Sequence, residues 1–489
     1  MRFINKISIC CFLLVLVLAI GCKKSFLTEE PRTVTINDLI NNPTDGAQRL
    51  IAAVYSKLYD WNVHTFSWIG ISSITSDDAE KGSYSGDTGT DKNKLDDWTF
   101  DPTSLSFDEV WRGNFEGIGR AAYALKFIPT INIPAQDKDR YIGEAKTLRA
   151  YFYWNLIRIF GGVPKIDHVL TSQQEIQEAS VRASAATIYA FIEEDLNDAI
   201  AKLPPVLTTS ERGRVSRGAA QALLAKVSLY QQKWARANGL ADALIGSGQY
   251  SLMTDYALIW REVGEFSSES IWEVNAIGIT PNKGVQQYSL VQGPNGPGGL
   301  GWGFNSPTQN LYDAYEPGDK RRDATIMKRG QTLWDGFVVN PGSPNPYSNY
   351  KSYISKTQET FNGDDEQTNK NYRIFRYGEV LLIKAEAANE LGDTTAAKLA
   401  LNQLRVRAGL LPVNAISQAN MRNIIYKERR VEMAMEHDRM FDLQRTGRAA
   451  AVLQALGKPY VSPKHNLFPI PQAQRDLSGN RLEQNPGYF

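Results

Sequence analysis

The sequence has almost no cysteine and very little histidine. Its 489 residues contain three cysteines, Cys10, Cys11 and Cys22, all near the amino terminus, and four histidines. A body without cysteine excludes disulfides, thiolate metal sites and cysteine nucleophiles from the folded part of the chain. No two histidines have the i, i+4 spacing of a helical zinc site, so the sequence argues against a zinc enzyme.

An excess of charge of either sign is also missing. Lys and Arg number 54 against 53 Asp and Glu, a formal charge of +1. Binding along a phosphate backbone needs a basic excess, and we therefore expect no nucleic-acid partner. Aromatic residues are plentiful instead, with 10 Trp, 22 Tyr and 19 Phe.

The amino terminus predicts a lipoprotein. An apolar run over residues 7–20 is shorter than the roughly 20 residues that span a bilayer, and it ends in LAIGC at residues 18–22, which resembles a bacterial lipobox. We predict a signal peptide over 1–21 and a lipid-anchored tether over 22–45, with Cys22 acylated. More than one acyl chain gives durable anchoring. An ordinary secretory peptide with a chance cysteine is the alternative. The rest of the chain has no second apolar run of spanning length, so we expect membrane contact through the lipid alone.

Apolar residues recur at helical spacing through much of the body. Two adjacent segments, 217–232 and 234–245, predict a helix pair, and 380–391 with 397–408 predict a second. Their alanine-rich faces let helices approach closely, as in tetratricopeptide repeats. We expect further helices over 140–160 and 189–203.

The amino-acid composition changes in the middle of the chain. Glycine and proline are frequent between about 265 and 370, and such segments cannot continue helices. We therefore predict one domain over 46–489, with a helical scaffold mainly over 46–260 and 371–450, a loop-rich region over about 265–370 and a C-terminal segment over 451–489. Long loops on a rigid scaffold are commonly functional.

Short motifs spread along the whole length carry a resemblance. They are SFL at 25–27 after Cys22, Val110-Trp111 with Ile118, RAYFYWNLIRIFGGVP at 149–164, GRVSRGAA at 213–220, FRYGEV at 375–380, ERRVE at 428–432, DRMFDL at 438–443, FPIP at 468–471 and QNPGY at 484–488. In this order they resemble the SusD/RagB family of lipoproteins, the glycan-capturing partners of TonB-dependent outer-membrane transporters in Bacteroidetes.

The resemblance implies a mostly α fold, in which tetratricopeptide-like helix pairs pack against an irregular region that carries the ligand site. It also implies an outer-membrane, cell-surface protein that captures oligosaccharide without hydrolysing it. A SusC-like TonB-dependent transporter is then the partner, and no enzyme activity or cofactor is expected. Because RagB-like members bind peptides, a peptide receptor of the same architecture is an alternative.

Aromatic residues in glycine-rich loops are the best candidates for a glycan site. A sugar ring offers a face of C–H bonds to an aromatic plane and an edge of hydroxyls to polar groups. Trp302 has glycines on both sides, and Phe304, Tyr288 and Tyr84 lie in or near similar loops. We predict that these four side chains stack on glycan. Further candidates in a second loop cluster are Trp334, Tyr347 and Tyr350.

The acidic clusters allow several interpretations. Asp77 and Asp78 are predicted polar contacts for a glycan, or, with Glu80, the carboxylates of a glycosidase. Calcium could be held by residues 87–97 or 364–366 through carboxylate oxygens. Charges alternate over 427–448, as an ion-paired helix requires, and we interpret that segment as structural.

Overall fold

The computed structural model describes residues 36–84, 86–276, 278, 285–296, 301–361, 368–414 and 417–488. The predicted signal peptide and Cys22 lie outside these ranges, as do residues 364–366. Among the described residues, no helix combines the length and the apolar character that crossing a membrane requires.

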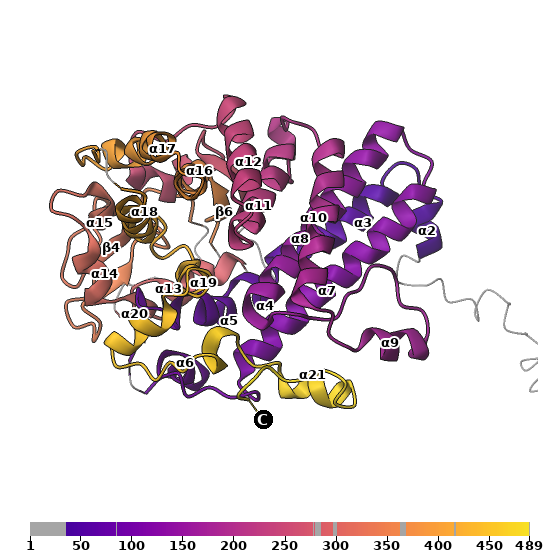
Figure 1. The fold of residues 1–489 in the computed structure, drawn as a ribbon, viewed down its shortest axis with the longest axis horizontal. Helices are drawn as coiled ribbons and strands as arrows, with labels where there is room; N and C mark the ends of the chain where they lie inside the picture. Colours follow the sequence, from indigo (N-terminus) through magenta and orange to yellow (C-terminus); the bar gives the residue numbers. More distant parts are fainter. Residues whose placement is uncertain are drawn as a thin grey trace, which may run out of the picture.

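Long helices form the frame of the molecule, and they pack as neighbouring pairs (Figure 1). They are α3 Gly46–Tyr55, α7 Leu105–Phe127, α8 Ala135–Phe160, α10 Ala185–Lys202, α11 Arg217–Tyr230, α12 Trp234–Gly246, α16 Tyr377–Glu390, α17 Thr394–Arg407 and α18 Gln418–Glu432. Helix α8 packs between α7 and α10, while α11 pairs with α12 and α16 with α17. The mostly helical fold and each predicted helix pair are confirmed.

Sequence signals at the helix ends explain several boundaries. The Ser216 side chain accepts a hydrogen bond from the Ala219 amide at the start of α11, and Asp393 caps α17 in the same way through the Ala396 amide. Helix α8 ends at Phe160 and is followed by Gly161, whose φ of 72° favours glycine.

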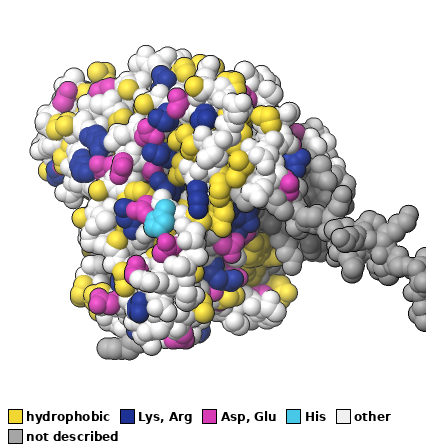
Figure 2. Space-filling model, turned by 90° about the vertical axis from the view of Figure 1, so that its right-hand side faces the viewer, with side chains coloured by type: hydrophobic (Ala, Val, Ile, Leu, Met, Phe, Trp, Pro, Cys, Tyr) yellow, Lys and Arg dark blue, Asp and Glu magenta, His cyan; other side chains and the backbone are white. Residues whose placement is uncertain are grey.

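Shorter helices cover the remaining surface, many of them in the parts of the chain that connect the pairs. They are α2 Ile36–Ile40, α4 Trp61–His64, α5 Phe66–Ile69, α6 Thr90–Asp96, α9 Gln173–Ala179, α13 Tyr288–Gln292, α14 Gln309–Ala314, α15 Lys320–Thr325, α19 Arg439–Arg445, α20 Ala449–Ala455 and α21 Gln472–Leu477. On the face shown in Figure 2, Lys and Arg side chains are interspersed with Asp and Glu, in keeping with the near-zero net charge.

Short antiparallel strands tie the loop-rich region to the rest. The strands are β1 Ala79–Gly82, β2 Ser270–Val274, β3 Phe304–Pro307, β4 Ile326–Lys328, β5 Tyr347–Asn349 and β6 Tyr372–Arg376. Strand β1 pairs with β3, β2 with β6 and β4 with β5. The loop-rich region is therefore not wholly irregular, and two of its strands pair with strands outside it.

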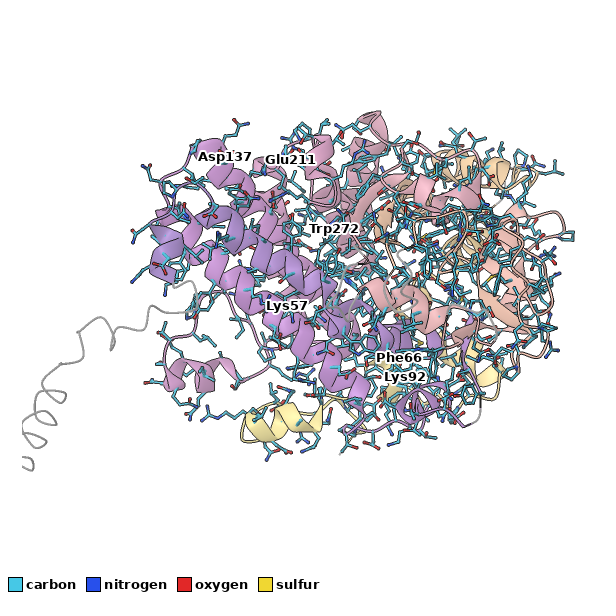
Figure 3. The ribbon with its side chains drawn as sticks, turned by 180° about the vertical axis from the view of Figure 1, so that it is seen from behind. Lys57, Phe66, Lys92, Asp137, Glu211 and Trp272 are labelled. Atoms are coloured by element: carbon cyan, nitrogen blue, oxygen red, sulfur yellow. The ribbon has the colours of Figure 1, made fainter. Side chains whose placement is uncertain are left out.

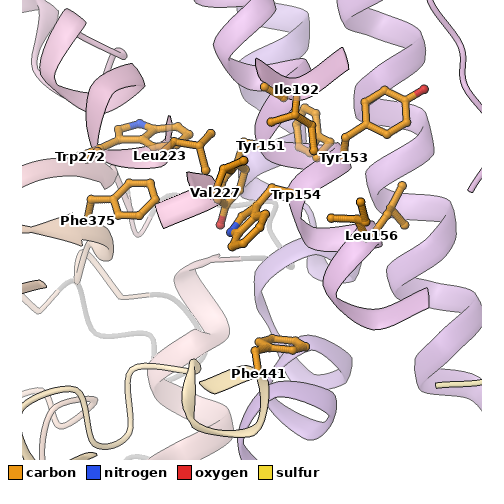
Figure 4. Close-up of a cluster of buried hydrophobic side chains, with 14 of the residues drawn as sticks. Tyr151, Tyr153, Trp154, Leu156, Ile192, Leu223, Val227, Trp272, Phe375 and Phe441 are labelled. Atoms are coloured by element: carbon orange, nitrogen blue, oxygen red, sulfur yellow. The ribbon is translucent and has the colours of Figure 1, made fainter. Parts of the chain in front are cut away.

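The core runs without a break from the helix pairs into these strands. Trp272 on β2 lies near the centre of the molecule (Figure 3), and the Tyr151 ring of α8 meets it edge-on at 5.1 Å. Trp154 and Phe375 belong to the same cluster (Figure 4). The aromatic run over 149–164 is buried, so most of the aromatic surplus stabilises the scaffold.

Buried ion pairs join the carboxyl-terminal helices to the loop-rich region. The Arg376 guanidinium on β6 contacts Glu432 at 2.6 Å and Glu269 at 3.0 Å, and all three side chains are buried. The structural interpretation of 427–448 agrees with these buried pairs, but the segment is not one continuous helix. Helix α18 ends at Glu432 and α19 begins at Arg439, because Met435 and His437 have φ of 63°. Ion pairs such as Arg376–Glu432 connect separate elements, whereas Arg439 and Arg445 also reach Asp442 within α19.

Candidate ligand-binding site

The pairing of β1 with β3 brings two loops with predicted aromatics together. Beyond the Gly82–Phe304 pair, the Ser83 amide donates to the Gly303 carbonyl at 2.6 Å. Gly82 has φ 71°, and a Cβ there would lie 2.5 Å from the Gly303 oxygen, so this close approach requires glycine. Tyr84 and Trp302 follow directly, which makes them neighbours in the backbone although 218 positions separate their numbers.

Trp302 lies at the surface on an aromatic base. Its side chain is 37% exposed, and its ring centroid lies 6.2 Å from those of both Trp61 and Phe66. The Lys92 ammonium lies 4.3 Å from the Phe66 ring centroid (Figure 3), which adds a cation–π contact. We call Trp61, Phe66, Trp302 and Phe304 the aromatic patch. Its rings hold the Trp302 indole in place while leaving part of it open to solvent.

Tyr84 and Phe304 have different places in this arrangement. Tyr84 is 58% exposed, as a stacking residue needs, and it directly follows Ser83, whose amide bonds the Gly303 carbonyl. Phe304 is buried, with its ring centroid 4.5 Å from that of Phe66. The prediction that Phe304 itself stacks on ligand is therefore corrected, because its ring supports the patch from below.

The prediction for Tyr288 is also corrected. Its side chain is buried, and its hydroxyl lies 2.7 Å from Nε2 of His437. The Tyr372 ring meets it edge-on at 5.1 Å. Burial raises the pKa of Tyr288 well above its usual value. Because other protein groups surround the Tyr288 ring, neither of its faces is open to a sugar.

Asp77 and Asp78 are structural rather than ligand-facing. Both are buried, and Arg439 donates two hydrogen bonds to Asp77, at 2.7 and 2.9 Å. Arg430 donates to Asp78 at 2.7 Å. Burial alone would raise the pKa of Asp77, but the hydrogen bonds from Arg439 outweigh it and lower that pKa. The site prediction for these two carboxylates is corrected, because both are buried and both form ion pairs with arginines.

The paired carboxylates also weaken the glycosidase alternative. Such an enzyme needs one free carboxylate and one protonated acid facing the same sugar, whereas Asp77 and Asp78 both face arginines. Two of the carboxylates in the predicted calcium segment 87–97 form ion pairs instead. Asp87 contacts Lys81 at 2.6 Å, and Asp96 contacts Lys458 at 2.6 Å. Within the described ranges, no group of three or more His, Cys, Asp or Glu side chains is placed to hold a metal ion.

The three further candidates are not members of the aromatic patch. Tyr347 stacks on Tyr312 with centroids 5.0 Å apart and rings within 9° of parallel, so one of its faces is covered. Trp334 and Tyr350 line a separate cavity of about 780 Å³. We call this cavity the Trp334 pocket.

Sequence reasoning missed two members of the aromatic patch. Trp61 and Phe66 lie on the short helices α4 and α5, far from the glycine-rich loops in the chain. No local signal marks them, because only the β1–β3 pairing places α4 and α5 under Trp302.

Two family models match the chain. The model described as SusD family matches residues 268–488, and the one described as starch-binding associating with outer membrane matches residues 34–229. Among curated proteins, SusD-like protein P2 of Formosa agariphila is 27% identical, over 82% of this chain and 85% of its own length. SusD-like protein P38 of the same organism is 26% identical over the full length of both.

Solved structures share the fold. A laminarin binding SusD-like protein is 29% identical with a TM-score of 0.79, covering 92% of this chain and all of that one. Surface glycan-binding protein A from Bacteroides thetaiotaomicron, solved in complex with laminarihexaose, is 25% identical with a TM-score of 0.77, over 90% of this chain and 99% of its own.

Proposed function

Because this chain belongs to the SusD/RagB family, we propose that it is a surface glycan-binding lipoprotein of the outer membrane, anchored through Cys22. It captures oligosaccharide without hydrolysing it, and it passes the glycan to a SusC-like TonB-dependent transporter. The binding needs no cofactor. The laminarin and laminarihexaose in the names of the two structural relatives support a glycan ligand.

The observation that carries the proposal is the exposed indole of Trp302 on its aromatic base. A rigid, part-exposed ring receives the C–H face of a sugar, and the supporting rings of Trp61 and Phe66 reduce the entropy lost on binding. Tyr84 extends the surface along the neighbouring loop.

Polar groups suited to the sugar's edge lie close by. The Asn345 amide donates to the Gly303 carbonyl at 3.4 Å, and the Asn295 amide lies about 3.0 Å from where a Cβ of Gly303 would be. Amides both donate and accept, as hydroxyl recognition requires. Because sugar hydroxyls leave good hydrogen bonds with water, the net gain per bond is small and the affinity modest.

Calorimetry tests the proposal. The soluble form lacking residues 1–22 is titrated with laminarihexaose, with other neutral hexaoses and with a peptide panel. We expect Trp302→Ala to weaken binding of the best hexaose at least about tenfold, or about 1.4 kcal/mol, with an unchanged far-UV spectrum. Tyr123→Ala is the matched control, because Tyr123 is an exposed aromatic on α7.

Several outcomes would contradict the proposal. Binding of peptides alone would favour the RagB-like alternative, and release of reducing sugar by the pure protein would make it an enzyme. Equal affinities of wild type and Trp302→Ala would remove Trp302 from the site. The transporter step is tested separately, by co-purification of a TonB-dependent outer-membrane protein with the lipidated chain.

A further inference from the structure

We propose that the Trp334 pocket is a second sugar site, separate from the aromatic patch, and that it takes a neutral oligosaccharide. The inference rests on the proposed function, since it extends glycan binding to a second place on the same molecule. The pocket and the patch have no residue in common.

The pocket is a hollow between segments that are distant in sequence. The short 3₁₀ turns at Tyr256–Trp260 and Glu262–Gly264 form part of its lining, and Trp334 and Tyr350 form another part. Its volume of about 780 Å³ falls within the range of small-ligand sites. Leu258 and Val263 are exposed at the same hollow, so its lining is largely apolar.

Trp334 is held outward by a tight turn. The Gly336 amide donates to the Leu333 carbonyl at 3.1 Å, and Gly336 has φ 87°. Leu333 is buried and Phe337 packs on the same small core cluster. With the residues on both sides anchored, the Trp334 indole stays 52% exposed. This is the geometry that stacking on a sugar face requires, and little order has to be gained on binding.

A buried arginine holds part of the pocket wall in place. Arg261 is 7% exposed and lines the hollow. Its Nη2 donates to the Tyr350 carbonyl at 2.9 Å, and its guanidinium lies 5.1 Å from the Tyr350 ring centroid. Its Nη1, which is shielded from solvent, faces the Glu359 carboxylate at 3.5 Å. Arg261 therefore fixes the Tyr350 ring and the Glu359 carboxylate as parts of the pocket lining.

The charges around the pocket select against acidic glycans. Of the described residues that line it, Asp255, Glu262 and Glu359 are acidic and Arg261 is basic. Glu262 is fixed by the Thr360 amide at 2.6 Å and Glu359 by the Ser355 amide at 2.8 Å. Negative charge held in place repels uronates and sulfates but accepts hydrogen bonds from neutral sugar hydroxyls. The ligand class is therefore a neutral oligosaccharide. Two modest sites on one protein would raise the avidity for a long glycan.

Fluorine NMR on the full-length lipidated protein in detergent tests this inference. The protein is labelled with 5-fluorotryptophan, and the Trp302 and Trp334 resonances are assigned by Trp302→Phe and Trp334→Phe. Neutral hexaoses with β-1,3, β-1,4 and α-1,4 linkages are the probes, and a hexaglucuronate is the charged control. We expect a neutral hexaose to shift the Trp334 resonance with saturation, in the wild type and in Trp302→Ala alike, and the hexaglucuronate to leave it unmoved.

Each outcome decides between the two proposals. A hexaose that shifts Trp302 but not Trp334 overturns the second site and leaves the proposed function standing. A shift of the Trp334 resonance alone supports the second site and rules out the aromatic patch as a sugar site. If no hexaose shifts either resonance, both proposals fail. An equal response of Trp334 to hexaglucuronate overturns the assignment to neutral ligands.

Discussion

Tryptophans in two parts of the molecule have opposite surroundings. Trp154 on α8 is 1% exposed, and the Tyr230 ring meets it edge-on at 4.6 Å. Trp302 and Trp334, in the loop-rich region, are 37% and 52% exposed. A helix surrounds each side chain with neighbours three and four residues away, whereas glycine-flanked loops provide few. The same residue type therefore stabilises the fold in the scaffold and is open to ligand in the loops.

The largest expected effect tests this contrast directly. Trp154→Ala removes a buried indole that also receives the Arg158 guanidinium at 4.7 Å, and it should lower the free energy of unfolding by about 3–5 kcal/mol. Trp302→Ala should lower it by less than about 1 kcal/mol. Urea unfolding followed by circular dichroism measures both. Similar losses in the two variants would show that the loop tryptophan is as structural as the helical one.

The second effect concerns charges rather than rings. Asp77→Asn removes the buried charge that accepts two hydrogen bonds from Arg439, and we expect a loss of about 3 kcal/mol in unfolding free energy. Asp137→Asn is the matched control, because Asp137 is an exposed residue in the first turn of α8 (Figure 3), where a charge contributes about 0.3–1 kcal/mol. Glycan affinity should be unchanged in both variants. A stable Asp77→Asn protein with weakened glycan binding would return Asp77 to the ligand site.

The same contrast explains what the sequence could predict. Helix pairs were predictable because their signal is local: apolar spacing, caps and turn glycines within one segment. The exposure of Trp302 was also predictable from its immediate neighbours, because the glycines on both sides have no side chains that could cover its ring. Tyr288 and Asp77 were wrongly assigned because their partners are distant. His437 lies 149 positions from Tyr288, and Arg439 lies 362 positions from Asp77. Trp61 and Phe66 escaped notice for this reason too.

The third effect comes from a histidine buried where the scaffold meets the loop-rich region. Burial lowers the pKa of His64 from 6.5 to about 4, and its ring stacks on Tyr372 with centroids 4.6 Å apart. Between pH 6.5 and 4 the unfolded chain therefore binds a proton at His64 that the folded protein does not bind. The contribution of the neutral His64 to the free energy of unfolding is present above pH 6.5 and is lost as the pH falls toward 4. From pH 7.5 to 5 the loss is roughly 2 kcal/mol.

A comparison of variants isolates this contribution. Burial raises the pKa of Glu265 to about 7, so Glu265 stabilises the fold at acid pH and opposes the histidine. Urea unfolding of wild type and His64→Gln is measured at pH 5 and 7.5. Because Glu265 is present in both proteins, its contribution drops out of the difference between them. The variant should lose about 2 kcal/mol less than wild type on acidification. Identical pH dependence in both would mean that the folded protein protonates His64 at pH 5 as readily as the unfolded chain does.

The smallest expected effect lies at the edge of the aromatic patch. Tyr84 is more exposed than Trp302, at 58% against 37%, so its ring loses more freedom when a sugar orders it. Tyr84→Ala should weaken binding of the best neutral hexaose only two- to threefold, or about 0.5 kcal/mol. Calorimetry on Tyr84→Ala, Trp302→Ala and the double variant measures whether the losses add. Additive losses would mean that one glycan contacts both loops independently. An unchanged affinity in Tyr84→Ala would mean that the glycan contacts Trp302 but not Tyr84. In that case, exposure alone would not make a loop aromatic part of a sugar site, and a supporting ring would also be required.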